Sequence, residues 1–121
     1  MIILNEKEYT CPVDVTLGLI GGKWKILILF HLHYFTKKSY SEMKTNLPKV
    51  SEKMLSQQLR ELERDGLVEK LVLSLKPYRV EYSLTDKGKT LGSLCEFVSK
   101  WGVDYLMENG IDYIKDQNLY K

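Results

Sequence analysis

Apolar residues recur at helical spacing in two stretches of the first third of the chain. In the first, residues 12–20, Pro12 can open a helix because its fixed φ suits the first turn, and the glycines at 21–22 end that helix. The second stretch, residues 24–34, is apolar on most sides and predicts a buried helix. For residues 1–10 we expect a loose arm.

Polar residues mark a short third helix. Residues 36–39 form a polar connection, and a capping box places the start of the helix at Ser39, with Ser41 as the alternative N-cap. The helix would run through residues 43–46. It stops before Pro48, because the residue that precedes a proline avoids the helical region.

Ser51 caps a fourth helix over residues 52–65, whose two faces differ in chemistry. Leu55, Leu59 and Leu62 fall on one face when residues are placed about 100° apart, and this face predicts the core side. The opposite face gathers cations and hydrogen-bonding groups: Lys53, Ser56, Gln57, Arg60 and Arg64, with Met54 and Gln58 at its edges.

A β-hairpin and a long helix complete the predicted order. Two strand-like runs, residues 67–73 and 79–84, are joined by a loop at 74–78. Thr85 then caps a helix over residues 86–109. One side of this helix is apolar, with Leu91, Leu94, Val98, Trp101 and Tyr105.

Short helices followed at once by a hairpin are the order of a winged helix-turn-helix, so the expected fold class is α+β, mainly α. A length of 121 residues suits one domain, since domains typically span ~100–150 residues. We therefore assign 1–121 to a single domain. Its parts are the arm (1–10), N-terminal helices (11–35), helix-turn-helix and wing (39–85), C-terminal helix (86–110) and a tail of ambiguous structure (111–121).

The polar face of the fourth helix suits the major groove of DNA. Gln can hydrogen-bond to an adenine, Arg can donate two hydrogen bonds to a guanine, and Lys or Ser can bind a phosphate. An ordinary solvated helix face is the alternative for any single residue. The candidate DNA-binding residues of this helix are Ser51, Lys53, Ser56, Gln57, Gln58, Arg60 and Arg64.

The hairpin adds a second candidate contact. Lys76 and Arg79 lie in or near its turn beside Tyr78, and Lys70 precedes them. A wing of this kind can reach phosphates or the minor groove. The alternative is edge protection, in which charges prevent one sheet from pairing with another, and it suits Lys70 better than the turn residues.

Charge and cysteine content add modest constraints. Residues 36–89 carry 12 Lys/Arg and 8 Asp/Glu, and the rest of the chain carries 6 and 8, so the middle is mildly basic. This small excess of positive charge suits a polyanionic partner, but by itself it is weak evidence for one. The longest apolar run is far shorter than a membrane span. Two distant cysteines make no disulfide framework, and we expect a cytoplasmic protein.

No constellation of residues supports an enzyme, a metal site or a cofactor. His31 and His33 are two residues apart, so on a helix they point about 200° from each other and cannot share a metal. Cys95 is expected to be a small buried hydrophobe. Trp24, Trp101, Tyr105 and Met107 are expected to be packing residues.

Four blocks of sequence, in order, resemble the HxlR-type winged-helix transcription regulators, which are related to the MarR regulators. They are Cys11-Pro12 with Gly21-Gly22-Lys23-Trp24, residues 54–63 with Asp65-Gly66-Leu67-Val68, Val80 to Thr85, and Gly88. The resemblance covers residues 11–105 and implies a homodimer on operator DNA. It also implies that the helix after Ser51 reads the major groove, that the hairpin is the wing, and that the first and last helices form the dimer interface.

The resemblance also suggests a sensing role for Cys11, because some family members respond to oxidants or electrophiles through a cysteine placed like it. Cys11 stands at the start of the first helix, where the helix dipole favours a thiolate. A buried, inert cysteine is the alternative. For the whole protein, the alternatives are a winged-helix protein-interaction module and a regulator with a non-covalent small-molecule effector.

Overall fold

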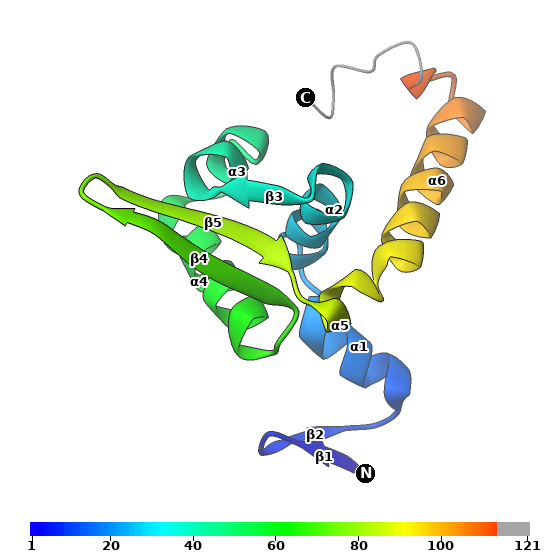
Figure 1. Ribbon diagram of the computed structural model, residues 1–121. Helices are drawn as coiled ribbons and strands as arrows, with labels where there is room; N and C mark the ends of the chain where they lie inside the picture. The colour runs from blue at the N-terminus through cyan, green and yellow to red at the C-terminus, as the bar shows by residue number, and fades with distance from the viewer. Residues whose placement is uncertain (114–121) are drawn as a thin grey trace.

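The computed structural model of the chain describes residues 1–113 (Figure 1). In chain order the elements are β1 (Ile2–Leu4), β2 (Lys7–Tyr9), α1 (Pro12–Ile20), α2 (Lys25–Phe35), β3 (Lys37–Ser39), α3 (Tyr40–Asn46), α4 (Glu52–Arg64), β4 (Val68–Leu75), β5 (Tyr78–Leu84), α5 (Asp86–Lys89) and α6 (Gly92–Glu108). Helices α3 and α4 followed by the β4–β5 hairpin form a winged helix-turn-helix, which confirms the predicted fold class.

Local capping interactions set the starts of α3 and α4. The Ser39 side chain accepts a hydrogen bond from the Glu42 backbone N–H at 3.1 Å, and the Ser39 N–H donates to Glu42 Oε1 at 2.9 Å. This is the predicted capping box, and Ser39 rather than Ser41 is the N-cap. The Ser51 hydroxyl accepts from the Met54 N–H at 3.1 Å, as its position before α4 predicts.

The core lies where α2, α3 and α4 meet the sheet. Leu55, Leu59 and Leu62 of α4 are each at most 1% exposed, which confirms the predicted core stripe. They belong to the same apolar cluster as Ile28 and Leu32 of α2. The polar face of α4 is therefore turned outward, because the leucine face occupies the interior.

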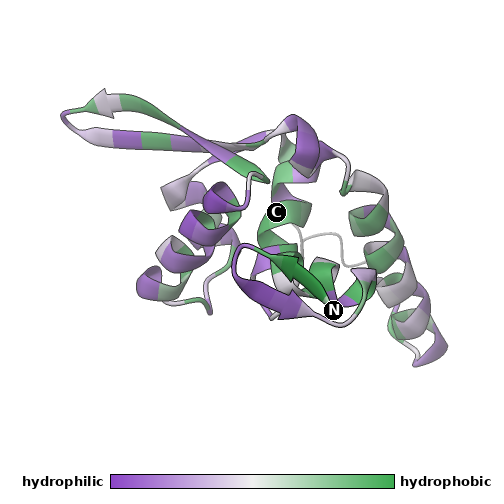
Figure 2. Ribbon diagram, turned by 90° about the horizontal axis from the view of Figure 1, so that it is seen from below, coloured by the Kyte–Doolittle hydropathy of each residue, from purple (hydrophilic) through white to green (hydrophobic). Residues whose placement is uncertain are grey.

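The wing belongs to a three-stranded antiparallel sheet in the order β3-β5-β4. Residues 36–39, predicted to be a polar connection, thus include a strand, because β3 pairs with β5 from Lys37 opposite Ser83 to Ser39 opposite Glu81. The β4–β5 hairpin is longer and its turn is tighter than predicted, since Leu75 pairs directly with Tyr78. The outer half of the hairpin projects well beyond the rest of the molecule (Figures 1 and 2).

The loose arm predicted for residues 1–10 is wrong. Strands β1 and β2 pair in a small hairpin, with Ile2 opposite Tyr9. Its turn places Asn5 and Glu6 at positive φ, a conformation that asparagine tolerates better than most residues. A Cβ at Gly18 would lie only 2.8 Å from the Tyr9 ring, so the hairpin rests closely on α1.

The single long C-terminal helix predicted for residues 86–109 is also wrong. Thr85 caps as predicted, accepting from the Gly88 N–H at 3.0 Å, but α5 ends at Lys89 and α6 begins at Gly92. At the start of α6 the backbone passes so close to α2 that a Cβ on Gly92 would lie 2.6 Å from the His33 ring. The break redirects α6, which then extends along and past α2 (Figure 1). The tail predicted at 111–121 lies largely outside the described residues.

One buried ion pair joins α2 to α4. The Lys25 Nζ donates to Glu61 Oε1 at 2.8 Å, and the two side chains are 8% and 25% exposed. The hydrogen bond from Lys25 is the main reason why the pKa of Glu61 is lowered. The pair therefore holds α4 against the N-terminal part of the fold.

We expect Lys25→Met to lower the free energy of unfolding by about 1–3 kcal/mol at neutral pH, because it removes a charged hydrogen bond from a partly buried carboxylate. The folded-state pKa of Glu61 is lowered, so the stabilisation is present above the ordinary glutamate pKa and is lost as pH falls through the folded value. The difference between wild type and variant in urea denaturation should therefore shrink at acidic pH. Lys49→Met, at an exposed lysine, is the control; an equal loss of stability in both variants would contradict this role.

Candidate nucleic-acid interface

The outward face of α4 carries most of the predicted DNA-binding side chains. Lys53, Gln57, Arg60 and Arg64 are exposed, whereas Ser56 is half-buried. The Ser56 hydroxyl lies 3.1 Å from the hydroxyl of Tyr40, which donates to the backbone carbonyl of Glu52 at 3.0 Å. The hydroxyls of Ser56 and of the N-cap Ser51 thus already hold structural hydrogen bonds.

A concave surface separates α4 from the wing and brings several of these residues together. It encloses a cavity of about 840 Å³. Side chains that are positively charged or that can hydrogen-bond line it from three parts of the fold: Lys53, Ser56 and Arg60 from α4, Tyr40 and Ser41 from α3 with its N-cap Ser39, and Lys70, Tyr78, Arg79 and Tyr82 from the wing. Two carboxylates, Glu52 and Glu63, also line it. We call this hollow the α4–wing cleft.

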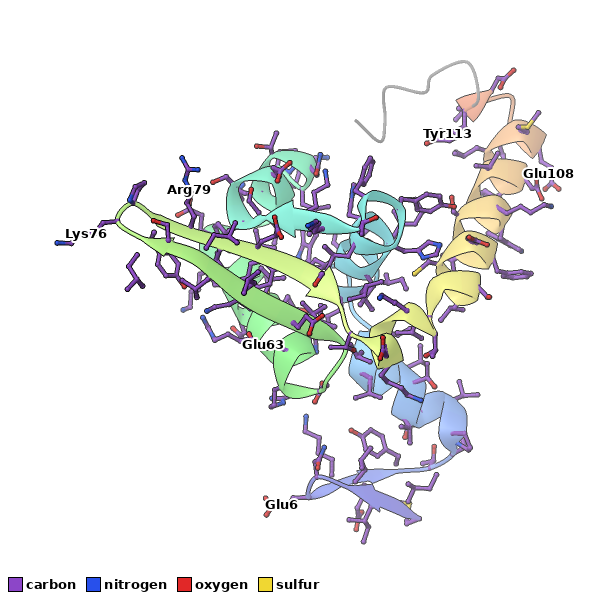
Figure 3. All side chains as sticks on the ribbon, in the orientation of Figure 1. Glu6, Glu63, Lys76, Arg79, Glu108 and Tyr113 are labelled. Carbon is purple, nitrogen blue, oxygen red and sulfur yellow. The ribbon has the colours of Figure 1, made fainter. Side chains whose placement is uncertain are left out.

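The other predicted residues lie elsewhere. Gln57 is on the opposite edge of the polar face, where its side chain helps to lower the pKa of Glu61, and Gln58 is half-buried. Arg64 is held by its neighbour Asp65, with Nε 3.2 Å from Oδ1, and this contact raises the arginine pKa. Lys76 stands at the outer end of the wing (Figure 3).

Tyr40 is a residue of the cleft that sequence reasoning missed. It follows the N-cap of α3, and its hydroxyl joins α3 to the first turn of α4. Nothing in the periodicity distinguishes it from a surface tyrosine, because its partners on α4 are 12 and 16 residues away in the sequence.

The two cysteines occupy opposite environments. Cys11 is exposed and is the N-cap residue of α1. The thiol makes no capping hydrogen bond, but the nearby Asp14 backbone N–H, which favours a thiolate, is the main cause of its lowered pKa. Cys95 is 2% exposed and burial raises its pKa, which confirms it as a buried hydrophobe.

The two histidines of α2 lie in different surroundings. Burial, followed by the charge of Lys38, lowers the pKa of His31, so its ring is neutral near pH 7. His33 Nε2 lies 3.0 Å from Glu96 Oε1.

Within residues 1–113, no three His, Cys, Asp or Glu side chains come together in a way that could hold a metal ion. No helix in the same range is long and apolar enough to cross a membrane.

Helix α6 leaves a large apolar surface uncovered. Trp101, Tyr105 and Met107 were expected to be packing residues, but they are 61%, 54% and 49% exposed in the single chain. The Trp101 and Tyr105 rings stack on each other with centroids 5.4 Å apart. Trp24, by contrast, packs on the core as predicted. Between α2 and α6 lies an apolar cavity of about 290 Å³ that Cys95 helps to line.

The HxlR-like helix-turn-helix family matches residues 19–110, which include α4, the wing and α6. The chain belongs to the HxlR-like helix-turn-helix family. The match confirms the resemblance noted from the sequence blocks, although Cys11 lies outside the matched residues.

Relatives of this HxlR-like protein are transcriptional regulators by name. YtcD, an HTH-type transcriptional regulator of Bacillus subtilis (strain 168), is 42% identical over 103 residues, which cover 85% of this chain and 81% of YtcD. The redox regulator HypR in its oxidized form has a similar structure, with a TM-score of 0.73 at 42% identity, over 78% of this chain and 96% of that one. The reduced form of HypR gives a TM-score of 0.74 at 40% identity, over 82% and 99% of the two chains.

These similarities establish the general class of protein to which the chain belongs. This HxlR-like protein is a transcriptional regulator of the helix-turn-helix type, a class whose motif implies DNA binding and that normally has no catalytic activity.

Proposed function

We propose that the protein is a homodimer that binds operator DNA sequence-specifically, with α4 in the major groove and the β4–β5 wing on the neighbouring backbone or minor groove. The α4–wing cleft is the observation that carries this proposal. Its cations stand on two elements that flank one hollow, as simultaneous contacts of α4 and the wing with one DNA duplex require.

The geometry of α4 supports direct reading of bases. A major groove about 12 Å wide admits one α-helix. The buried leucine face of α4 turns Lys53, Gln57 and Arg60 to the outside. Arg60 can donate two hydrogen bonds to a guanine, and Gln57 can form two with an adenine. Lys53, near the N-terminus of the helix, is suited to binding a phosphate.

A protein-interaction module is the second candidate, because the two carboxylates in the cleft dilute its positive charge. The salt dependence of binding separates the two. A regulator that neutralises several phosphates loses affinity steeply as salt rises. A protein-docking module would bind the DNA flanking its own gene weakly at any salt concentration.

Substitutions on α4 and on the wing should have different effects. Gln57→Ala or Arg60→Ala is expected to cost about 1–3 kcal/mol of operator binding and to relax specificity at one base position. Lys76→Ala should weaken binding to all sequences alike and reduce the salt slope by about one. Footprinting and fluorescence anisotropy on the DNA flanking the gene measure both effects, with Lys100→Ala on α6 as the control. Unchanged operator affinity in both α4 variants would disprove the assignment of α4.

The exposed apolar surface supports the homodimer. On α6 it includes Trp101 and Tyr105, and on α1 it includes Val13 and Leu17, which are 66% and 60% exposed. Both helices lie on the side of the molecule away from the wing (Figure 1). A two-fold partner would bury these side chains and present two α4 helices to half-sites one or more DNA turns apart.

We expect light scattering to give twice the 14.1 kDa mass of one chain at micromolar concentration. Trp101→Glu places a charge within the apolar surface and should shift the mass toward the monomer. Lys100→Glu, at the adjacent polar position that pairs with Asp104, should remain dimeric. A monomeric wild type would contradict the dimer.

We further propose that Cys11 makes the regulator responsive to oxidants or electrophiles. Its exposure and lowered pKa favour a reactive thiolate, and the similarity to the redox regulator HypR supports the same role. Because Cys11 occupies the N-cap position of α1, its modification would act on a helix that we assign to the dimer interface. A non-covalent effector in the apolar cavity between α2 and α6 is the alternative.

Alkylation should modify Cys11 in the native protein near neutral pH and reach Cys95 only on unfolding, because burial raises the pKa of Cys95. Mass spectrometry measures this difference. Diamide or a quinone should change operator affinity in the wild type but not in Cys11→Ser, and Cys95→Ser should respond like the wild type. If Cys11→Ser responds as the wild type does, Cys11 is structural, and the proposal for DNA binding is unaffected.

A further inference from the structure

The outer part of the wing exposes several apolar side chains to solvent. The β4 residues Leu71, Leu73 and Leu75 are 59%, 54% and 78% exposed, and Tyr78 at the start of β5 is 58% exposed. This part of the hairpin projects beyond the helices (Figure 1). Exposed apolar clusters on a soluble protein commonly mark binding surfaces.

The pairing of the strands sorts these side chains onto two faces. Leu75 pairs with Tyr78 across the turn, so both side chains lie on one face of the hairpin. Along β5, Tyr78 shares this face with Val80 and Tyr82, which line the α4–wing cleft together with Tyr78. Leu71 pairs with Glu81 and lies on the opposite face. The side chains of Leu75 and Tyr78 at the tip of the wing thus extend the lining of the cleft outward.

The charge around this apolar pair is positive. Residues 70–80 contain Lys70, Lys76 and Arg79 and no acidic residue. Lys76 extends from the end of the wing and Arg79 stands beside the tip (Figure 3). A second copy of the wing would carry the same charges and be repelled. A polyanion that carries apolar surface between its charges would suit this tip better than a second wing does. The minor groove of DNA is such a surface, because sugars and base steps lie there between two rows of phosphates.

We propose that Leu75 and Tyr78 form an apolar wedge that enters the minor groove next to the site read by α4 and bends the DNA. Lys76 and Arg79 hold the phosphates that border the groove. Apolar side chains inserted in this way partly unstack a base step and bend the duplex by about 20–90°. The sequence of the deformed step then contributes to specificity without a hydrogen bond to any base. This inference rests on the proposed binding of DNA and adds bending to it.

The test uses a duplex that the wild-type protein selects from a randomised pool, labelled with a dye at each end. Energy transfer between the dyes should rise when the wild type binds, because bending brings the ends closer. Leu75→Ser and Tyr78→Ser should each reduce this rise and weaken binding about tenfold, which corresponds to about 1.4 kcal/mol. Their salt slopes should match the wild type, because no cation is removed.

Leu71→Ser is the matched control, since it removes the same kind of exposed side chain from the other face of the same hairpin. It should bend and bind DNA as the wild type does. A straight duplex in the wild-type complex, or equal bending by all three variants, would overturn the wedge while leaving DNA binding intact. Failure of the wild type to select any duplex would instead overturn the proposed function, and the wedge with it.

Discussion

The burial of one leucine face on α4 is the constraint on which the rest of the structure depends. Leu55, Leu59 and Leu62 recur at helical spacing and are almost fully removed from water. Burying one large aliphatic side chain stabilises the fold by about 1.5–3 kcal/mol, so rotation of α4 about its axis would be costly. The direction in which Arg60 and Gln57 point is therefore set by side chains that never meet a ligand.

Polar contacts then join α4 to the elements around it. Lys25 reaches Glu61 from α2, and Tyr40 reaches Ser56 from α3. Gln57, which we assign to base reading, contributes to the lowered pKa of Glu61, so it lies near the ion pair from α2. The Lys25–Glu61 ion pair thus joins α4 directly to α2, the helix that packs against α6.

The two cysteines illustrate how position rather than residue type sets reactivity. Cys11 is open to solvent at the N-terminus of a helix, where a backbone N–H stabilises negative charge and lowers its pKa. Cys95 lies against the core beside an apolar cavity, where a thiolate would lose its hydration, and its pKa is raised. An oxidant would therefore meet the first thiol well before the second.

The sequence alone determined the features that depend on residues close together in the chain. The N-caps at Ser39, Ser51 and Thr85 and the two faces of α4 follow from spacings of three or four residues, which a helix brings together wherever it lies. The blocks that resemble the HxlR-type regulators likewise indicated the fold and the class of protein.

Tertiary structure decided what depends on distant partners. The strand β3 exists because β5 pairs with it, and the break before α6 occurs where Gly92 meets His33, 59 positions earlier in the chain. Tyr40 joined the cleft through contacts with α4, 12 and 16 residues away in the sequence. The apolar stripe on α6 was visible in the sequence, but which of its side chains the chain itself covers was not, because spacing shows which side chains share a face and only packing determines what covers that face.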